Sequence, residues 1–114
     1  MFDSFCEKVV DVVLGMKQGP SLGDPDVDCG AICMGLGQMK KYQALVDDAV
    51  KKGAQLLAGG KIPKGRDPLA KGSFYPPTVL ADVPEDALIA QEEIFGPIMC
   101  IFKVHGNSDD EAVR

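Results

Sequence analysis

The sequence predicts an α/β fold, in which helices cover a sheet. Two long segments, residues 1–19 and 38–52, repeat apolar residues at three- and four-residue steps, as amphipathic helices do. Shorter apolar segments bounded by glycine or proline have the character of strands. These segments are residues 54–60, 74–83 and 97–104. The last of them, PIMCIFKV, is apolar on both faces apart from Lys103, which indicates a strand covered by helices on both sides.

The first predicted helix covers residues 1–19. Its apolar face consists of Phe2, Phe5, Cys6, Val9, Val13 and Met16. Ser4 followed by Glu7 fits a capping box, in which each side chain satisfies an otherwise unpaired amide. We expect Gly19 and Pro20 to end this helix.

A loop and a second helix follow. Residues 20–37 contain Asp24, Asp26 and Asp28 and then the apolar sequence CGAICMG, which we expect to form a short buried piece within the loop. The second helix is predicted from Gln38 to Lys52. Its apolar face consists of Met39, Tyr42, Leu45, Val46, Ala49 and Val50. The sequence Lys-Lys-Gly at 51–53 supplies cations and a left-handed cap at the end of the helix.

The remaining segments alternate between strands and loops. AQLLAGG, residues 54–60, is predicted to be a strand that ends in a glycine turn, and KIPKGRDPLAKG, residues 61–72, is predicted to be a loop. The loop cations could bind an anion, but lysines spread along a flexible loop do not converge, and a solvated surface loop is favoured. These cations are Lys61, Lys64, Arg66 and Lys71. FYPPTVLADV is a second strand, interrupted early by two prolines.

The sequence ends on a helix start signal. Ser108 and Glu111 repeat the Ser-x-x-Glu pattern, but the chain stops at Arg114, after barely one turn. An isolated helical turn has no stability of its own, and the opening helix has no preceding strand to cover. We therefore expect a sequence that is truncated at both ends.

The composition limits which binding partners and which cellular compartment are expected for the protein. Twelve lysines and arginines against seventeen acidic residues give a net charge of -5, which opposes binding to nucleic acid. No apolar run is long enough to span a bilayer, and no export signal opens the sequence. The four cysteines do not form a dense disulfide framework, so we interpret them as reduced, buried thiols of an intracellular protein, with a cytoplasmic location favoured.

The segment EEIFGP, residues 92–97, places two carboxylates beside an aromatic ring. Pro97 fixes its own φ and pushes Gly96 into an extended conformation. In an extended chain Glu93 and Phe95 would share one surface, with Glu92 and Ile94 turned the other way. A carboxylate can accept hydrogen bonds from vicinal hydroxyls and a flat ring can pack on a heterocycle, so one half of a nucleotide fits this pair. The alternative is that Glu93 caps a helix and Phe95 belongs to the core.

The sequence QEEIFGPIMCIFKV resembles the signature of the aldehyde dehydrogenase superfamily. Three further passages are similar to family sequences: FCEKVVDVVLGMKQGPSLGDPDVDCGAI, YQALVDDAVKKGAQLLAGG and GSFYPPTVLADVP. Together they cover nearly all of the chain in the order of the family.

The resemblance implies that residues 1–114 form part of a catalytic domain with helices packed on a mostly parallel sheet. It implies that Glu93 hydrogen-bonds the nicotinamide ribose of NAD or NADP and that Phe95 packs beside the nicotinamide ring. Members of the family oxidise an aldehyde to a carboxylic acid: a cysteine thiolate attacks the carbonyl, a hydride leaves to the nicotinamide, and a glutamate activates water to hydrolyse the thioester. A homo-oligomer is expected for the full-length enzyme.

The resemblance also shows what is missing. The family nucleophile sits in a Gly-Gln-x-Cys setting and the general base in Glu-Leu-Gly-Gly, and this sequence contains neither motif. No catalytic role therefore passes to Cys6, Cys29, Cys33 or Cys100, and we expect the 114-residue chain alone to be inactive. Neither the aldehyde nor the choice between NAD and NADP follows from the residues present.

Two other functions remain open. A metal or redox module could use Cys29 and Cys33 with Cys6, Cys100 or His105, but one loose cysteine pair and a lone histidine do not match a structural zinc site. We therefore expect no metal, and we expect His105 at the surface near a strand end. A truncated paralogue that acts as a noncatalytic binding or regulatory subunit is the second alternative.

Overall fold

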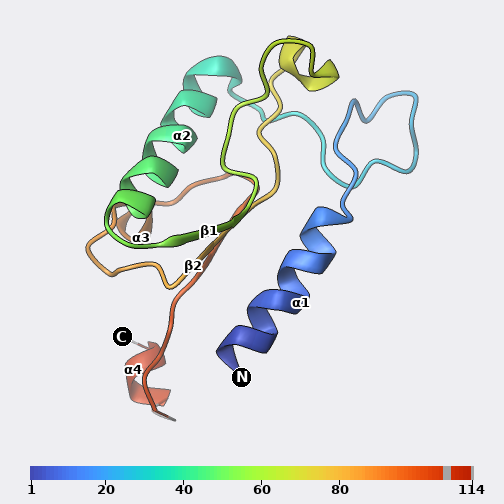
Figure 1. Ribbon diagram of the computed structural model, residues 1–114. Coiled ribbons are helices and arrows are strands. Elements are labelled where there is room, and N and C mark those ends of the chain that lie inside the picture. The colour runs from blue at the N-terminus through green and yellow to red at the C-terminus, as the bar shows by residue number, and fades with distance from the viewer. Residues whose placement is uncertain (107–108, 114) are drawn as a thin grey trace.

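A three-stranded sheet with helices on both faces forms the body of the protein (Figure 1). The computed structural model describes residues 1–106 and 109–113. Its helices are α1 (Phe2–Leu14), α2 (Gly35–Lys51), a 3-10 turn η1 (Pro68–Lys71), α3 (Leu88–Gln91) and α4 (Asp109–Val113). Its strands are β1 (Gln55–Ala58), β2 (Thr78–Ala81) and β3 (Ile98–Ile101). The predicted α/β class is confirmed.

The sheet is mixed among the described residues. The strand order is β1-β2-β3, with β1 antiparallel to β2 and β2 parallel to β3. The expectation of a mostly parallel sheet thus holds for one of these two pairings. β1 and β2 are joined by a loop that contains η1 and no crossover helix, which allows them to pair antiparallel. The connection from β2 to the parallel strand β3 contains α3.

The central strand β2 carries the two-sided burial that the sequence analysis assigned to residues 97–104. All four of its residues are buried. Leu80 faces the core on the α2 side, and Val79 and Ala81 belong to the core on the α1 side. In β3, by contrast, Met99 is 43% exposed, because β3 lies at the edge of the sheet in the part of the chain that the structure describes.

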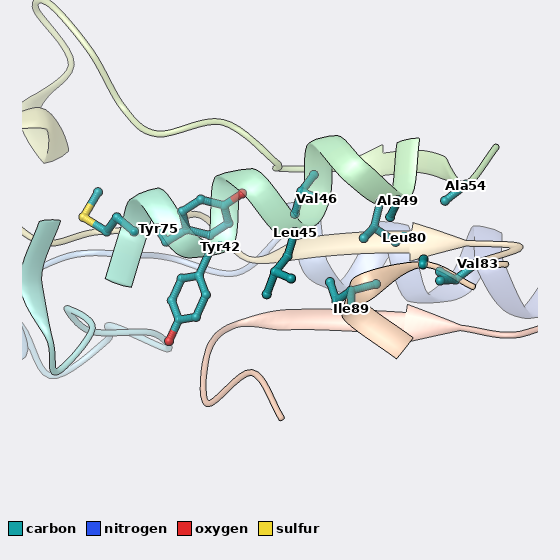
Figure 2. Close-up of a cluster of buried hydrophobic side chains, with 11 residues drawn as sticks. Tyr42, Leu45, Val46, Ala49, Ala54, Tyr75, Leu80, Val83 and Ile89 are labelled. Carbon is teal, nitrogen blue, oxygen red and sulfur yellow. The ribbon is translucent and has the colours of Figure 1, made fainter. Parts of the chain in front are cut away.

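The larger core lies between α2, α3 and the sheet (Figure 2). The predicted apolar face of α2 forms much of it. Its members are Met39, Tyr42, Leu45, Val46, Ala49, Ala54, Tyr75, Leu80, Val83, Ala87 and Ile89. Helix α2 ends as predicted, with Lys52 as its C-cap and Gly53 at φ +115°. Helix α3 was not predicted, because one turn of helix is too short to show periodicity.

Helix α1 ends earlier than predicted, and its predicted capping box is absent. The helix stops at Leu14 with Gly15 as its C-cap rather than at Gly19 and Pro20. No side chain in the described part of the chain caps its start, and the Ser4 hydroxyl donates to the Met1 carbonyl, 3.1 Å away. Ser4 lies inside the first turn instead of before it, so its side chain cannot reach the amides that an N-cap residue satisfies.

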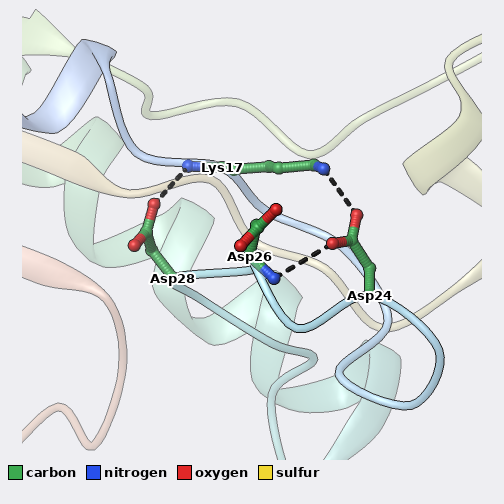
Figure 3. A network of polar contacts seen from close by, with 4 residues as sticks. All are labelled: Lys17, Asp24, Asp26 and Asp28. Carbon is green, nitrogen blue, oxygen red and sulfur yellow. Dashed lines mark hydrogen bonds and ion pairs between the residues drawn. The ribbon is translucent and has the colours of Figure 1, made fainter.

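The segment after α1 is closed by contacts across the loop (Figure 3). The Lys17 main-chain N–H donates to the Asp28 carboxylate at 2.9 Å, and the Lys17 ammonium group pairs with Asp24. The Asp24 carboxylate also accepts from the Asp26 N–H at 3.0 Å. The hydrogen bond from Lys17 is the main cause that lowers the pKa of Asp24 below its ordinary 3.8. These aspartates therefore hold the loop together.

The piece CGAICMG is not buried: Cys33 and Met34 are exposed, and only Ile32 contacts the larger core. This piece runs directly into α2, where the sheet does not cover it. Ser108 lies outside the described residues, so its capping role stays a prediction. Within residues 1–106 and 109–113, no helix is both long and apolar enough to cross a membrane.

Candidate functional site

The EEIFGP turn, residues 92–97, connects α3 to β3. The backbone becomes extended at Glu92, directly after α3, with φ -123° and ψ 145°. At the other end the Pro97 carbonyl accepts a hydrogen bond of 2.8 Å from Thr78, the first residue of β2. The turn is therefore tied to the sheet at the point where the parallel pairing of β2 and β3 begins.

Side chains of the turn divide between two surroundings. Glu92 forms an ion pair of 3.2 Å with Lys41 of α2, and Ile94 packs against the larger core. Glu93 is exposed and has no hydrogen-bond or ion-pair partner among the described residues. Phe95 is 85% exposed. The structure thus gives no support to a helix-capping role for Glu93 or to a core position for Phe95.

The turn is not extended throughout, which corrects the simple alternation expected from the sequence. Phe95 has φ +51°, in the left-handed region. This conformation costs an L-residue without a local side-chain hydrogen bond about 1 kcal/mol or more. A bulky residue in this conformation persists only where surrounding contacts hold it, so the contacts around Phe95 matter for the site.

Tyr42 of α2 provides the principal contacts. Its hydroxyl donates to the Phe95 carbonyl, and the two oxygens are 2.6 Å apart. Its ring lies against Gly96, where an added Cβ would be 2.6 Å from Tyr42 Cζ. Tyr42 is 1% exposed and meets Tyr75 edge to face, with ring centroids 5.5 Å apart (Figure 2). Its spacing in the sequence places Tyr42 on the apolar face of its helix, but no local pattern connects it to the turn.

The cysteines do not form a reactive centre. All four are free, but only Cys6 is buried, Cys33 is exposed, and Cys29 and Cys100 are intermediate. The interpretation as buried thiols is therefore right for Cys6 and wrong for Cys33, whose segment is not covered by the sheet. Burial raises the pKa of the Cys100 thiol above its ordinary 9.0, which disfavours the reactive thiolate.

The remaining candidates are surface residues. His105 is exposed just beyond β3, as expected. The loop cations Lys61, Lys64, Arg66 and Lys71 are also exposed. Among residues 1–106 and 109–113, no three His, Cys, Asp or Glu side chains converge on a point where they could hold a metal ion.

Two cavities lie away from the EEIFGP turn. One, of about 910 Å³, lies between the end of α2, the residues after β2 and β3, and α4. The other, of about 460 Å³, lies between α1 and the edge strand β1. Neither is lined by Glu93 or Phe95. The two predicted cofactor residues instead project from an open surface of the described chain.

Comparison with known proteins gives a consistent result over the whole chain. The model of the aldehyde dehydrogenase family matches residues 1–114. Glutarate-semialdehyde dehydrogenase of Pseudomonas putida is 38% identical over an alignment of 108 residues, and the match covers 90% of this chain and 20% of that protein. The NADP-dependent succinate-semialdehyde dehydrogenase of Mycobacterium avium is 36% identical over 114 residues, covering 100% of this chain and 22% of that protein.

Solved structures agree with the sequence relatives. An aldehyde dehydrogenase of Mycobacterium tuberculosis complexed with NAD+ superimposes with a TM-score of 0.84 at 32% identity, covering 98% of this chain and 22% of that chain. A betaine aldehyde dehydrogenase mutant of Staphylococcus aureus in complex with NAD+ gives 0.85 at 31% identity, with the same coverage of 98% and 22%. The chain therefore spans about a fifth of the length of the proteins it matches.

Proposed function

Because the chain belongs to the aldehyde dehydrogenase family, as its sequence motifs predicted, we propose that it supplies the nicotinamide-ribose side of an NAD(P) site. The reaction proposed for the enzyme as a whole is oxidation of an aldehyde to a carboxylic acid. Residues 1–114 would form part of its catalytic domain. The observation that carries the proposal is the presentation of Glu93 and Phe95, both exposed, from a turn that is anchored to α2 and β2.

The two side chains have the chemistry that a nicotinamide nucleoside requires. The Glu93 carboxylate has no partner among the described residues, so its oxygens can accept from vicinal ribose hydroxyls. The Phe95 ring, 85% exposed, offers a flat apolar face to a planar heterocycle. When bound, the nicotinamide supplies the acceptor for the hydride that leaves the aldehyde carbon.

Residues outside this chain would perform the covalent chemistry. None of its cysteines has the sequence setting of the family nucleophile, and Cys100 has a raised pKa. We expect no aldehyde-dependent production of NADH or NADPH by the 114-residue chain alone, measured by nicotinamide absorbance. Production above that of a variant without cysteines would contradict this expectation.

The names of the relatives guide the choice of the first substrates to test. Two similar proteins are named for glutarate semialdehyde and succinate semialdehyde, so aldehydes that carry one carboxylate at the opposite end of the molecule are the first to assay with the natural polypeptide that contains these residues. Unsubstituted aldehydes of equal length provide the comparison.

Two neighbouring carboxylates allow a matched test of the cofactor role. In the natural polypeptide, Glu93→Gln should raise the Kd for NADH or NADPH about tenfold or more, because a hydrogen bond to a charged group contributes about 1.5–3 kcal/mol. Glu92→Gln should change it less than about fivefold, because Glu92 forms a surface ion pair with Lys41, and such pairs contribute about 0–1 kcal/mol. Equal effects of the two substitutions would refute the assigned role of Glu93.

A further inference from the structure

We propose that Tyr42 is the positioning residue of the nicotinamide side of the site. This inference rests on the proposed function of Glu93 and Phe95 and extends it to a buried residue of α2. Tyr42 would not touch the cofactor. It would act by fixing the backbone from which the two exposed side chains project.

The hydroxyl of Tyr42 fixes the direction of one peptide group. It donates at 2.6 Å to the carbonyl of Phe95, the residue whose φ is +51°. Without this bond the carbonyl could rotate and Phe95 could return to a more favourable backbone conformation, since the left-handed one persists only where its surroundings hold it. Such a rotation would swing the Phe95 ring and move Glu93, two residues before it.

The ring of Tyr42 holds the next residue. An alanine Cβ at Gly96 would lie 2.6 Å from Cζ and 2.8 Å from Cε2 of Tyr42, so the turn and the ring are already in contact. The ring itself is held by its 1% exposure and by the edge-to-face contact with Tyr75. The preceding residue, Lys41, forms an ion pair with Glu92, so two successive residues of α2, Lys41 and Tyr42, contact the same turn.

The test compares two buried tyrosines in the natural polypeptide that contains these residues. Tyr42→Phe keeps the ring and removes only the hydroxyl. It should raise the Kd for NADH, or for NADPH if that is preferred, about three- to tenfold, which corresponds to the contribution of one hydrogen bond. Binding of ADP, or of adenosine bisphosphate for an NADP-dependent protein, should change less than about twofold, because these probes lack the nicotinamide ribose.

Tyr75→Phe is the control. Tyr75 is 0% exposed and contacts Tyr42, but its hydroxyl has no hydrogen-bond partner among the residues that the structure describes. Its removal should leave the Kd for both probes within about twofold of the wild type. Equal weakening of NADH and ADP binding by Tyr42→Phe, or selective weakening of NADH binding by Tyr75→Phe, would overturn the inference.

A double variant separates this inference from the proposed function. If Tyr42 acts through Glu93 and Phe95, Tyr42→Phe should weaken NADH binding less in a Glu93→Gln background than in the wild type. A strong effect of Glu93→Gln with none of Tyr42→Phe would overturn the positioning role and leave the proposed function standing. If Tyr42→Phe selectively weakens NADH binding and Glu93→Gln does not, the role of Glu93 would be refuted. The positioning of Phe95 by Tyr42 would be supported.

Discussion

Replacing Gly96 by alanine tests how tightly the EEIFGP turn is packed on α2. The new Cβ would lie 2.6 Å, 2.8 Å and 2.9 Å from Cζ, Cε2 and the hydroxyl oxygen of Tyr42. The Tyr42 ring has little room to move, because it is 1% exposed and packed against Tyr75. Overpacking of this kind costs about 1–3 kcal/mol, and displacement of the hydroxyl from the Phe95 carbonyl adds about 1 kcal/mol. We expect a total of about 2–4 kcal/mol.

The chain contains its own probe for this experiment. It has no tryptophan and two tyrosines, and both tyrosines lie in the core beneath the turn. Urea unfolding followed by tyrosine fluorescence should show a midpoint about 1–2 M lower for Gly96→Ala, at a slope of about 2 kcal/mol per M. Gly37→Ala is the matched control. Gly37 lies in α2, and no side chain or other segment of the described chain comes within 4 Å of its Cβ position, so alanine there should leave stability equal or raise it by up to about 1 kcal/mol.

A combination with Tyr42→Phe divides the two contributions. Phenylalanine keeps Cζ and Cε2, so Gly96→Ala should still destabilise that background by the overpacking contribution of about 1–3 kcal/mol. The hydrogen-bond contribution should disappear. An unchanged urea midpoint for Gly96→Ala in the wild type, beside a normal result for Gly37→Ala, would refute the close packing of Tyr42 on the turn.

Three further predictions concern pH and strain. Burial, with the charge of Asp47 as a second cause, raises the pKa of Tyr75 to about 12 from 10.0. The folded chain therefore keeps a proton that the unfolded chain loses. The contribution of Tyr75 to the free energy of unfolding should be fully present below pH 10 and should fall by about 3 kcal/mol between pH 10 and 12. The urea midpoints of Tyr75→Phe should lack this fall, and an identical fall in that variant would exclude Tyr75 as its source. The hydrogen bond from the Leu88 N–H, followed by Lys52, lowers the pKa of Asp48 below 3.8, so its stabilisation should be present above that pH and lost as the pH falls through the lower folded value. Asp48→Asn should weaken this acid dependence, and an unchanged acid profile would contradict it. Phe95→Asn should stabilise the chain by about 0.5–1 kcal/mol in thermal unfolding, because asparagine tolerates φ +51°, while weakening NADH binding by the natural polypeptide; a loss of stability would show that Phe95 is not strained.

Local pattern predicted the secondary structure where it was long and regular. Helix α2 was placed at residues 38–52 and is found at Gly35–Lys51, because its apolar repeat and terminal glycine are both local signals. The end of α1 was placed too late. The Lys17 N–H bonds to Asp28, a residue eleven positions away, and Lys17 also accepts from that segment, so the chain leaves the helix for partners that periodicity does not show.

The candidate site also contains features that local sequence pattern predicted and features that it did not. Alternation along the chain was enough to separate Glu92 from Glu93, and the structure places Glu92 against Lys41 and leaves Glu93 exposed. The left-handed backbone of Phe95 was not foreseeable, because Tyr42, whose hydroxyl bonds the Phe95 carbonyl, is 53 positions away in the sequence. The same separation hid Tyr42 itself, whose spacing within α2 marks it only as a core residue.

The energetics of Phe95 favour function over folding as the reason for its conformation. A phenylalanine that is 85% exposed forgoes most of the roughly 1.5–3 kcal/mol that burial of its side chain would contribute, and the left-handed backbone costs about 1 kcal/mol more. The contacts from Tyr42 offset the backbone cost but do nothing to bury the ring. A turn selected for stability alone would place a polar residue or glycine at this position. We propose that a partner covers the exposed ring, and a flat cofactor ring that also reaches the Glu93 carboxylate would meet that requirement.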